Sequence, residues 1–568
     1  MKKYILASAT FFMAFGLCLG QGAIDGYNLS QPDMKGTARF MGMAGAFGAL
    51  GGDLSTLSQN PAGIGVYRSG DVGFTLDLDC QKNSASAQGS VNDMTQTKFL
   101  LNNIGAVVTM RLPSKAMPNI NFGFTYNKGA SFNRKYGGRI PTLFNSLSNY
   151  IAGISNSEGL TEGDVSYDTN YDPYNPGYND YVSPWLSILG YDGYLITPTQ
   201  GNGFTRWYGQ WGEATSGSGA FRVNERGSVD EYNIAIGGNI ADVVYWGMNF
   251  DITGINYSMD AVWAENLNDA YVPGNNNVIV RESARWDLNN VYNASGTGFK
   301  YSLGVIVKPI QELRLGVAFH TPTWYNITEN YGASIDYLYG GTISGYAETN
   351  DGILGYNNVS FRTPMKLMAS VAGVIGQNFI LSFDYEWTPY DKMKYSLPNS
   401  YAGGYDYPWY DSPWDYYAAA PKKVSSYETG IFDNDPFGST NRAIKTYYKS
   451  TNTFRVGAEF KITPSFSVRA GYSYVSSPVK DAAKDDLITI STAGTIPNYR
   501  FDNETNYITC GLGYRYQRFY IDLAYVYKNM ASTYHAYTPD PKDPYNPSPE
   551  SKLSFVNNQV ILSAGFRF

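Results

Sequence analysis

Alternation of apolar and polar side chains is the dominant pattern of this chain, and it is clearest over Phe555–Phe568. Small, polar or charged residues alternate there with Val560, Leu562, Ala564, Phe566 and Phe568. A strand with a period of two presents one face to an apolar phase and the other to a polar phase. We therefore predict a strand that meets lipid on one side and a polar lumen on the other. The alternative, the last strand of a soluble sheet, does not explain why the pattern recurs upstream.

The same alternation predicts thirteen further strands, most of them in pairs joined by short turns. Their approximate ranges are 71–81, 98–112, 118–127, 229–239, 243–263, 299–308, 313–325, 361–374, 378–387, 452–461, 466–476, 505–516 and 519–528. With the last strand they make fourteen, and bacterial transmembrane barrels have even numbers of antiparallel strands. Long connections separate the pairs, as expected when short turns face the periplasm and long loops face outward. The sequence predicts an all-β, fourteen-stranded antiparallel transmembrane β-barrel.

The longest predicted loop, Lys128–Ser228, has apolar residues at helical spacing in two places. They fall in Pro141–Ser155 and Pro184–Leu195, and we expect short helices there over the outer mouth. These apolar residues either present a surface to ligands or pack the loop against itself; the sequence favours neither. The tracts Tyr405–Tyr417 and Pro539–Pro549, rich in Tyr, Pro and Asp, are predicted to be exposed loop tips.

The N-terminal twenty residues have the features of a secretory signal peptide. Lys2 and Lys3 precede an apolar run over Tyr4–Leu19, and Gly20 ends a small-x-small cleavage site. The run is too short for a membrane-spanning helix. We predict a signal peptide over 1–20, a separate leading segment over 21–70 and a barrel over 71–568, in the outer membrane of a Gram-negative bacterium.

Composition supports a barrel and argues against nucleic-acid binding. The chain has 60 Gly and 50 Tyr among 568 residues, with 16% charged residues and a net charge of -7, whereas ordinary globular chains have roughly 25% charged residues. A negative net charge without a basic cluster does not suit nucleic acid. Cys80 and Cys510 fall on strands that are not neighbours, so we expect no disulfide between them.

The leading segment Gln21–Gly70 is rich in small residues and ends near Asn60-Pro61-Ala62-Gly63. At this point the chain resembles the long-chain fatty-acid transporter family of outer-membrane proteins (FadL/TodX type). Members are fourteen-stranded barrels closed by an N-terminal hatch, with an Asn-Pro-Ala motif just before the first strand. Pro61 restricts its own backbone and that of Asn60, which leaves the Asn60 side chain free to hydrogen-bond nearby backbone. We therefore predict that Asn60, Pro61, Ala62 and Gly63 anchor the hatch.

The resemblance implies uptake of hydrophobic compounds, long-chain fatty acids or similar molecules, with the ligand displacing part of the hatch. Flexible methionine and aromatic side chains suit apolar ligands of varying shape. The predicted ligand-binding residues are Phe40, Met41, Met43, Phe47 and Leu50. In this family an inward kink of strand three opens a lateral exit to lipid; Gly123 and Gly129 are the candidates for such a kink here.

Charged residues on the predicted inward faces have two possible roles. They are Asp384, Glu386, Arg455, Glu459, Arg469, Arg515, Asp522 and Arg567. Opposite charges on neighbouring strands fill a polar lumen and hold a plug, which is the role we favour. A cationic subset would instead receive a carboxylate headgroup.

The pattern gives no support for an enzyme. The only histidines are His320 and His535, and neither has the spacing of a metal site or a catalytic triad. We expect no cofactor and no metal, and a lumen hydrogen bond for His320. A general porin would not explain the glycine-rich leader, and a surface adhesin would leave it without a role; both remain alternatives.

Expected partners are hydrophobic small molecules or lipids, the outer-membrane lipid and the barrel-assembly machinery, with the protein a monomer. Phe566 and Phe568 belong to the terminal strand, which resembles the assembly signal of outer-membrane barrels. We predict that these two residues direct assembly.

Overall fold

The computed structural model describes residues 22–31, 33–114, 116–168, 170–176, 183–201, 204–273, 279–376, 378–398, 437–484, 490, 492, 494–538 and 548–568. The predicted signal peptide, the tract Tyr405–Tyr417 and most of Pro539–Pro549 lie outside the described residues. Cleavage after Gly20 and the domain boundaries at residues 20 and 70 stay predictions.

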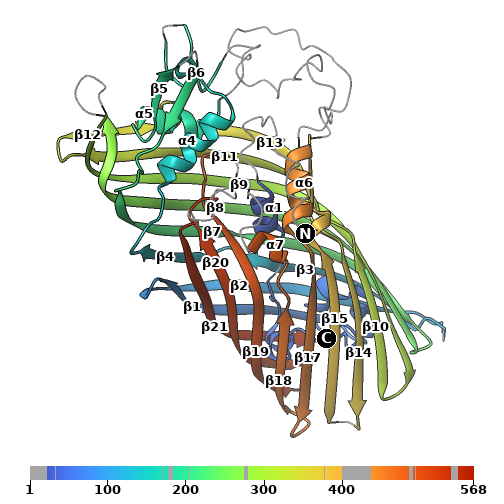
Figure 1. Ribbon diagram of the computed structural model, residues 1–568. Helices are drawn as coiled ribbons and strands as arrows, with labels where there is room; N and C mark the ends of the chain where they lie inside the picture. Colours follow the sequence, from blue (N-terminus) through green and yellow to red (C-terminus); the bar gives the residue numbers. More distant parts are fainter. Residues whose placement is uncertain are drawn as a thin grey trace, which may run out of the picture.

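The wall is a closed antiparallel barrel of fourteen strands, as predicted (Figure 1). Two of the fourteen consist of two segments each, β10 with β11 and β13 with β14. In order around the wall, the segments are β1 (Asp71–Ala87), β2 (Ser90–Arg111), β3 (Asn119–Ser131), β7 (Ser216–Ile240), β8 (Val244–Pro273), β9 (Ile279–Ile310), β10 (Leu313–His320) with β11 (Trp324–Tyr339), β13 (Gly355–Arg362) with β14 (Lys366–Ile375), β15 (Phe379–Pro389), β17 (Ser450–Lys461), β18 (Phe466–Val475), β19 (Tyr499–Tyr516), β20 (Phe519–His535) and β21 (Glu550–Arg567). β21 pairs with β1 over the whole height, from Asp71↔Arg567 to Ser86↔Lys552, and closes the barrel.

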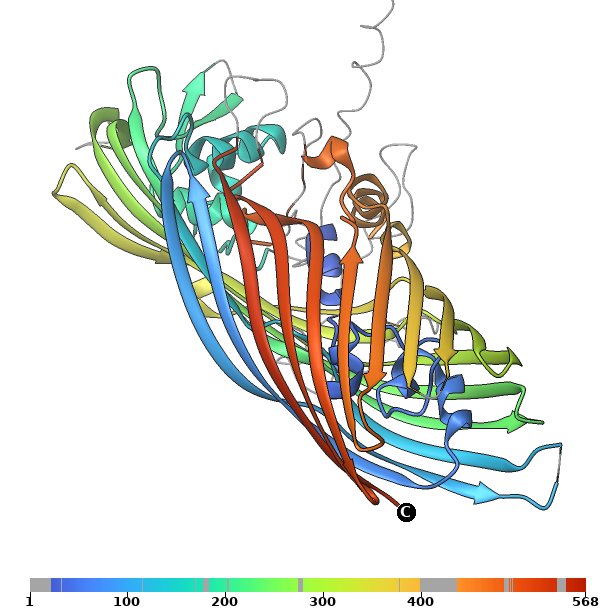
Figure 2. The same ribbon diagram turned by 90° about the horizontal axis from the view of Figure 1, so that it is seen from below.

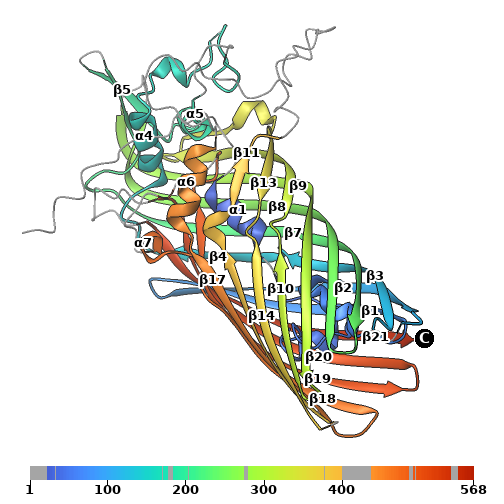
Figure 3. The same ribbon diagram turned by 90° about the vertical axis from the view of Figure 1, so that its right-hand side faces the viewer.

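Several strands continue well beyond their predicted ends at the outer side. β8 runs to Pro273 and β9 begins at Ile279, although the alternation had predicted a loop over 264–298. β1 and β2 are joined by a tight turn where a loop over 82–97 was expected. Outward residues of the upper β9, such as Asn289 and Asn293, are polar, whereas the inward residues Trp286, Leu288 and Tyr292 are apolar and buried, so the apolar face is the inner one above the lipid. The long wall is visible in Figure 3.

Outward-facing apolar side chains form the lipid-facing band. Examples from five parts of the wall are Met248, Leu303, Val317, Leu381 and Leu562, which are all exposed. Their neighbours along each strand face the lumen and are buried and mostly small or polar. Cys80 is half-buried on β1 and Cys510 is exposed on β19. Among the described residues, none of the helices combines the length and the apolar character needed to cross a membrane.

Residues 22–70 lie inside the barrel as a plug of short helices (Figure 2). They form α1 (Ala23–Ser30), α2 (Ala38–Gly42), α3 (Thr56–Gln59) and the 3-10 helix η1 (Pro61–Val66). Ala38, Met41, Met43, Phe47 and Leu57 are fully buried. The segment therefore fills the lower lumen with packed side chains.

Short elements cover the outer mouth. They are β4 (Arg134–Ile140), α4 (Leu147–Ser157), η2 (Glu162–Asp164), α5 (Trp185–Asp192), β5 (Thr197–Gly201), β6 (Phe204–Tyr208), β12 (Ile343–Glu348), η4 (Thr349–Gly352), η5 (Tyr390–Lys392), β16 (Lys394–Ser396), α6 (Gly438–Tyr447) and α7 (Asp481–Lys484). α4 overlaps the first range predicted to be helical and extends past its end at Ser155, and α5 falls within the second. Their apolar residues Leu147, Ile151, Ile188 and Leu189 are completely buried, so they pack the loops together instead of facing solvent.

Candidate functional site

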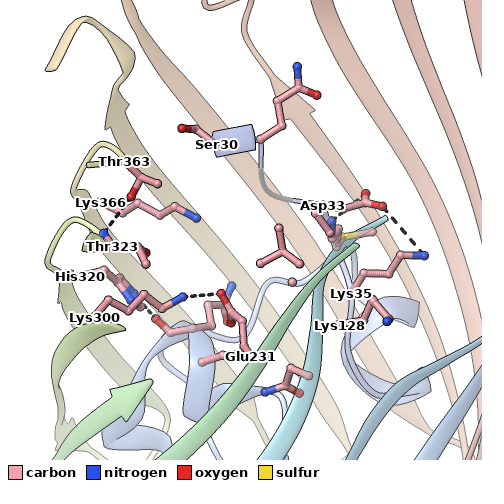
Figure 4. Close-up of a pocket in the computed structure, with 18 of the residues that line it drawn as sticks. Ser30, Asp33, Lys35, Lys128, Glu231, Lys300, His320, Thr323, Thr363 and Lys366 are labelled. Atoms are coloured by element: carbon pink, nitrogen blue, oxygen red, sulfur yellow. Dashed lines mark hydrogen bonds and ion pairs between the residues drawn. The ribbon is translucent and has the colours of Figure 1, made fainter. Parts of the chain in front are cut away.

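A polar cavity of about 160 Å³ lies in the lumen above the plug (Figure 4). The segment after α1, including Asp33 and Lys35, borders it on one side. The wall contributes two regions, one on β3 and β7 around Gly129 and one where β10 meets β11 and β13 meets β14. Its charged side chains make it suited to the polar end of a ligand.

Most charges around this cavity are neutralised in ion pairs. Such pairs join Lys300 to Glu231 at 2.5 Å, Lys128 to Asp230 at 2.6 Å, Lys35 to Asp77 at 2.7 Å, Lys528 to Asp33 at 2.9 Å and Arg455 to Glu386 at 3.0 Å. Lys366 differs from these cations. Its ammonium points into the cavity in Figure 4, and within the described part of the chain no carboxylate lies within 4.0 Å of it. Lys366 therefore lacks a direct ion-pair partner among the described residues, although Glu386 and Glu231 attract it from a greater distance.

Two facing prolines interrupt the wall beside Lys366. The register between β10 and β14 ends at His320↔Lys366, and that between β11 and β13 begins at Trp324↔Arg362. Pro322 and Pro364 lie opposite each other in this gap and have no N–H to donate. The Thr363 N–H donates to the Thr323 carbonyl at 3.1 Å, and the Thr323 N–H donates to the Thr363 hydroxyl at 2.8 Å. We call residues 321–323 and 363–365 the proline break.

On the opposite wall, β3 leaves its neighbour β2. The two strands pair only from Asn103↔Asn127 downward, so β2 above Asn103 has no strand partner on that side. Gly129 is the extra residue of a bulge between β3 and β7, because Lys128 pairs with Asp230 and Ala130 with Val229. Bulges bend a strand locally. A gap between β2 and β3 thus begins beside the cavity.

Gly129 and Gly123, the two kink candidates, have different environments. Gly129 is at the bulge, and its carbonyl accepts a hydrogen bond from the Asp33 N–H at 3.2 Å. A Cβ on Gly123 would lie 2.5 Å from a methyl group of Leu57. Gly123 therefore makes room for the plug within a regular part of the strand.

The five predicted ligand-binding residues pack together below the cavity. Phe40, Met41, Met43, Phe47 and Leu50 are at most 6% exposed and form one cluster with wall residues such as Tyr507 and Val526. The Phe40 and Phe47 rings are 5.6 Å apart. Of the five, Phe40 lines the cavity. A ligand reaches the other four only if the plug moves, and their ligand role stays a prediction.

The Asn60-Pro61-Ala62-Gly63 motif joins the plug to itself and lies close against the wall. The Asn60 amide donates to the Gly48 carbonyl at 2.6 Å, and its oxygen accepts from the Ala62 N–H at 3.1 Å as the cap of η1. A Cβ on Gly304 would lie 1.9 Å from Asn60 Oδ1, and one on Gly247 would lie 2.0 Å from the Pro61 carbonyl. These two wall glycines are direct neighbours in the register of β8 and β9. Only glycine permits so close an approach.

Inward charges hold the plug to the wall. Arg39 of the plug makes two hydrogen bonds with Glu459, and Glu459 also pairs with Arg469 at 2.6 Å. Arg469 in turn pairs with Asp522 at 2.6 Å. Asp384 accepts a hydrogen bond from the Gly48 N–H at 2.9 Å. For these residues the structure supports the plug-holding role over headgroup binding.

His320 makes the lumen hydrogen bonds expected of it. Its Nδ1 is 2.8 Å from the Ser302 hydroxyl, and its Nε2 is 2.8 Å from the Gln59 carbonyl of the plug. Since that carbonyl can only accept, Nε2 carries the proton. His320 therefore links the plug to the proline break, which begins at the next residue.

The lysines of the cavity were missed in the sequence, whereas Arg455 was among the predicted inward charges. Lys300 lay at the end of a predicted strand and Lys366 within one, and pairing between strands decides which of them meets a carboxylate. Pro322 and Pro364 were the available indication, because proline inside a strand marks an edge or a bulge. Both fell within segments that were predicted as continuous strands.

At the terminal strand, Phe566 packs against Phe519 with ring centroids 4.8 Å apart. Phe568 is half exposed and exchanges two backbone hydrogen bonds with Gly70. Their role in assembly stays a prediction.

The structure is thus a plugged antiparallel barrel with a polar cavity beside two irregularities of its wall. Residues 215–543, more than half of the chain, match the family described as outer membrane protein transport protein (OMPP1/FadL/TodX), and the chain belongs to that family. It is accordingly an outer-membrane transport protein of a Gram-negative bacterium.

Solved structures with low sequence identity resemble the chain. A Pseudomonas aeruginosa FadL homologue is 12% identical, with a TM-score of 0.48 over 94% of this chain and 99% of that one. The Pseudomonas putida toluene transporter TodX is 11% identical, with a TM-score of 0.45 over 94% and 99%. The Ralstonia pickettii toluene transporter TbuX is 12% identical, with a TM-score of 0.44 over 95% and 100%. Among curated proteins no sequence matches.

Proposed function

We propose that this protein takes up long-chain fatty acids or similar amphiphilic hydrophobic compounds across the outer membrane. Lys366 is the observation that best supports this proposal. It has no carboxylate partner among the described residues, and it lines the cavity above an apolar cluster. A carboxylate headgroup would pair with the ammonium, and the hydrocarbon tail would extend toward Phe40. A neutral aromatic hydrocarbon, such as the toluene in the names of two similar structures, would gain only a weaker cation–π contact from this charge.

The gap between β2 and β3 supports a sideways exit for such a ligand. It adjoins Gly129, which lines the cavity. A second, smaller polar cavity lies inside the barrel between Asp79, Arg134 and Asn557. Exposed apolar residues of β2, Phe99 and Leu101, border the gap. We infer that the tail leaves toward lipid here after the plug has shifted. Monomeric state and recognition by the assembly machinery belong to the same proposal.

Substitution of Lys366 tests the headgroup site. We expect Lys366→Gln to weaken oleate binding by the purified protein about 10- to 100-fold, the range for a charge-assisted hydrogen bond. Binding of oleyl alcohol, which has no charge, should stay unchanged. Lys366→Arg should restore most of the oleate affinity, and Lys461→Gln, at the exposed end of β17, is the matched control. Equal oleate affinity for Lys366→Gln and the parent protein would refute the assignment.

A further inference from the structure

An exposed pair of basic residues lies on the outside of the wall, at the proline break. Arg362 of β13 and Lys394 of β16 are direct partners in the strand register. Their neighbours Phe361 and Tyr395 are buried and pack on each other inside the barrel, with ring centroids 4.7 Å apart. Successive side chains of a strand point to opposite faces. Arg362 and Lys394 therefore both point outward, and both are exposed.

The height of this pair corresponds to the outer boundary of the lipid. Arg362 is also the register partner of Trp324, which is 38% exposed and contacts Phe299 at 5.4 Å between ring centroids. Below these rings the outward residues are apolar, as at Leu367 and Val317. Above them they are polar, as at Asn326 and Ser360. Exposed aromatic rings mark the membrane–water interface, so Arg362 and Lys394 lie at the level of the outer-leaflet headgroups.

The two cations repel each other and lack a protein counter-charge. Like charges directly opposite on neighbouring strands are destabilising. Some exposed cations of the outer surface have a carboxylate partner: Lys82 pairs with Asp93 at 2.9 Å, Arg226 with Asp260 at 2.5 Å and Lys392 with Asp391 at 2.9 Å. Across the part of the chain that the structure describes, no carboxylate lies within 4.0 Å of Arg362 or Lys394. Arg362 and Lys394 are therefore free to bind an anion from outside the described chain.

We propose that Arg362 and Lys394 bind the phosphate group of an outer-leaflet lipid. A phosphate between them would accept two parallel hydrogen bonds from the guanidinium and one from the ammonium. The acyl chains of the same lipid would lie along Trp324, Phe299 and Leu367. Such a lipid is bound on the outer surface and is not the transported compound, so the site is separate from the lumen. It holds together β13 and β16 beside the proline break, where Pro364 cannot donate to its neighbour.

Native mass spectrometry of the purified full-length protein tests this site with diphosphorylated lipid A as the probe. We expect the parent protein to retain this lipid and the double variant Arg362→Gln/Lys394→Gln to bind it about 10- to 30-fold more weakly, as expected for two cations at a membrane surface. Raising the salt concentration should weaken binding by the parent more than binding by the variant, because exposed charges are screened.

Matched variants separate this site from general surface charge. Arg222→Gln/Arg285→Gln removes two exposed cations from β7 and β9, which are not register partners of each other, and should leave lipid A affinity within about twofold. Arg362→Lys/Lys394→Arg keeps both charges and should keep the affinity. Heat-modifiable migration in electrophoresis confirms that each variant is a folded barrel. The proposal is overturned if Arg362→Gln/Lys394→Gln binds like the parent, if the Arg222/Arg285 control loses as much, or if phosphatidylcholine competes equally.

Discussion

At the scale of single residues, substitution of Asn60 most directly tests how the plug is held in place. Asn60→Ala removes its hydrogen bond to the Gly48 carbonyl and the cap of η1, which should cost about 1–2 kcal/mol of plug stability. The wall has its own paired strands and should stay folded. We expect limited proteolysis to cut the plug of Asn60→Ala faster, with unchanged heat-modifiable migration. Ser58→Ala, which loses one half-buried hydroxyl bond to the Ser55 carbonyl, is the control. Equal cleavage rates for both variants would show that Asn60 is not an anchor.

At the scale of elements, we expect the stability of helix α5 to depend on pH. Burial, reinforced by the negative charge of Asp351, raises the pKa of Asp192 at the end of α5 to about 6. A carboxyl whose pKa is raised on folding stabilises the fold in its protonated form, and stability falls as pH rises from about 4 through 6. We expect the α5 amides to be better protected from hydrogen exchange at pH 5 than at pH 7.5, after correction for intrinsic rates. Asp192→Asn should abolish the difference. A parent protein with equal protection at both pH values would contradict this.

At the scale of the whole molecule, the plug should make the barrel a poor ion conductor. Arg39 and Lys35 bind Glu459 and Asp77 of the wall, and His320 binds the Gln59 carbonyl of the plug. The side chains of the plug leave little open space. Deleting residues 21–57, with Asn60-Pro61-Ala62 kept, should raise conductance in planar bilayers and weaken oleate binding together. A heat-modifiable barrel must be recovered for the comparison. High conductance in the intact protein would favour a general porin.

The wall could be predicted from the sequence over the height of the lipid, because there each strand has an apolar face toward lipid and a polar face toward the lumen. Residues such as Leu303 and Leu562 face lipid and produce the predicted pattern. In the upper strands the outward residues, such as Asn289 and Asn293, are polar and the apolar side chains face inward, so these parts did not match a lipid-facing strand. The plug was predicted through its glycines and Asn60. The site around Lys366 was not, because its free charge depends on which lysines meet Glu231 and Glu386 after strands far apart in the sequence come together.

The proline break also constrains how the length of this wall can change. Between His320 and Trp324 the strand has one residue more than the facing stretch of β9, and the stretch from Arg362 to Lys366 matches it residue for residue. Losing Pro322 alone would match this strand to β9 residue for residue and keep the side chains above on their present faces, but it would leave one extra residue in the stretch from Arg362 to Lys366. Losing Pro322 and Pro364 together would restore a regular ladder. The interruption can therefore disappear from the wall only when both strands are shortened.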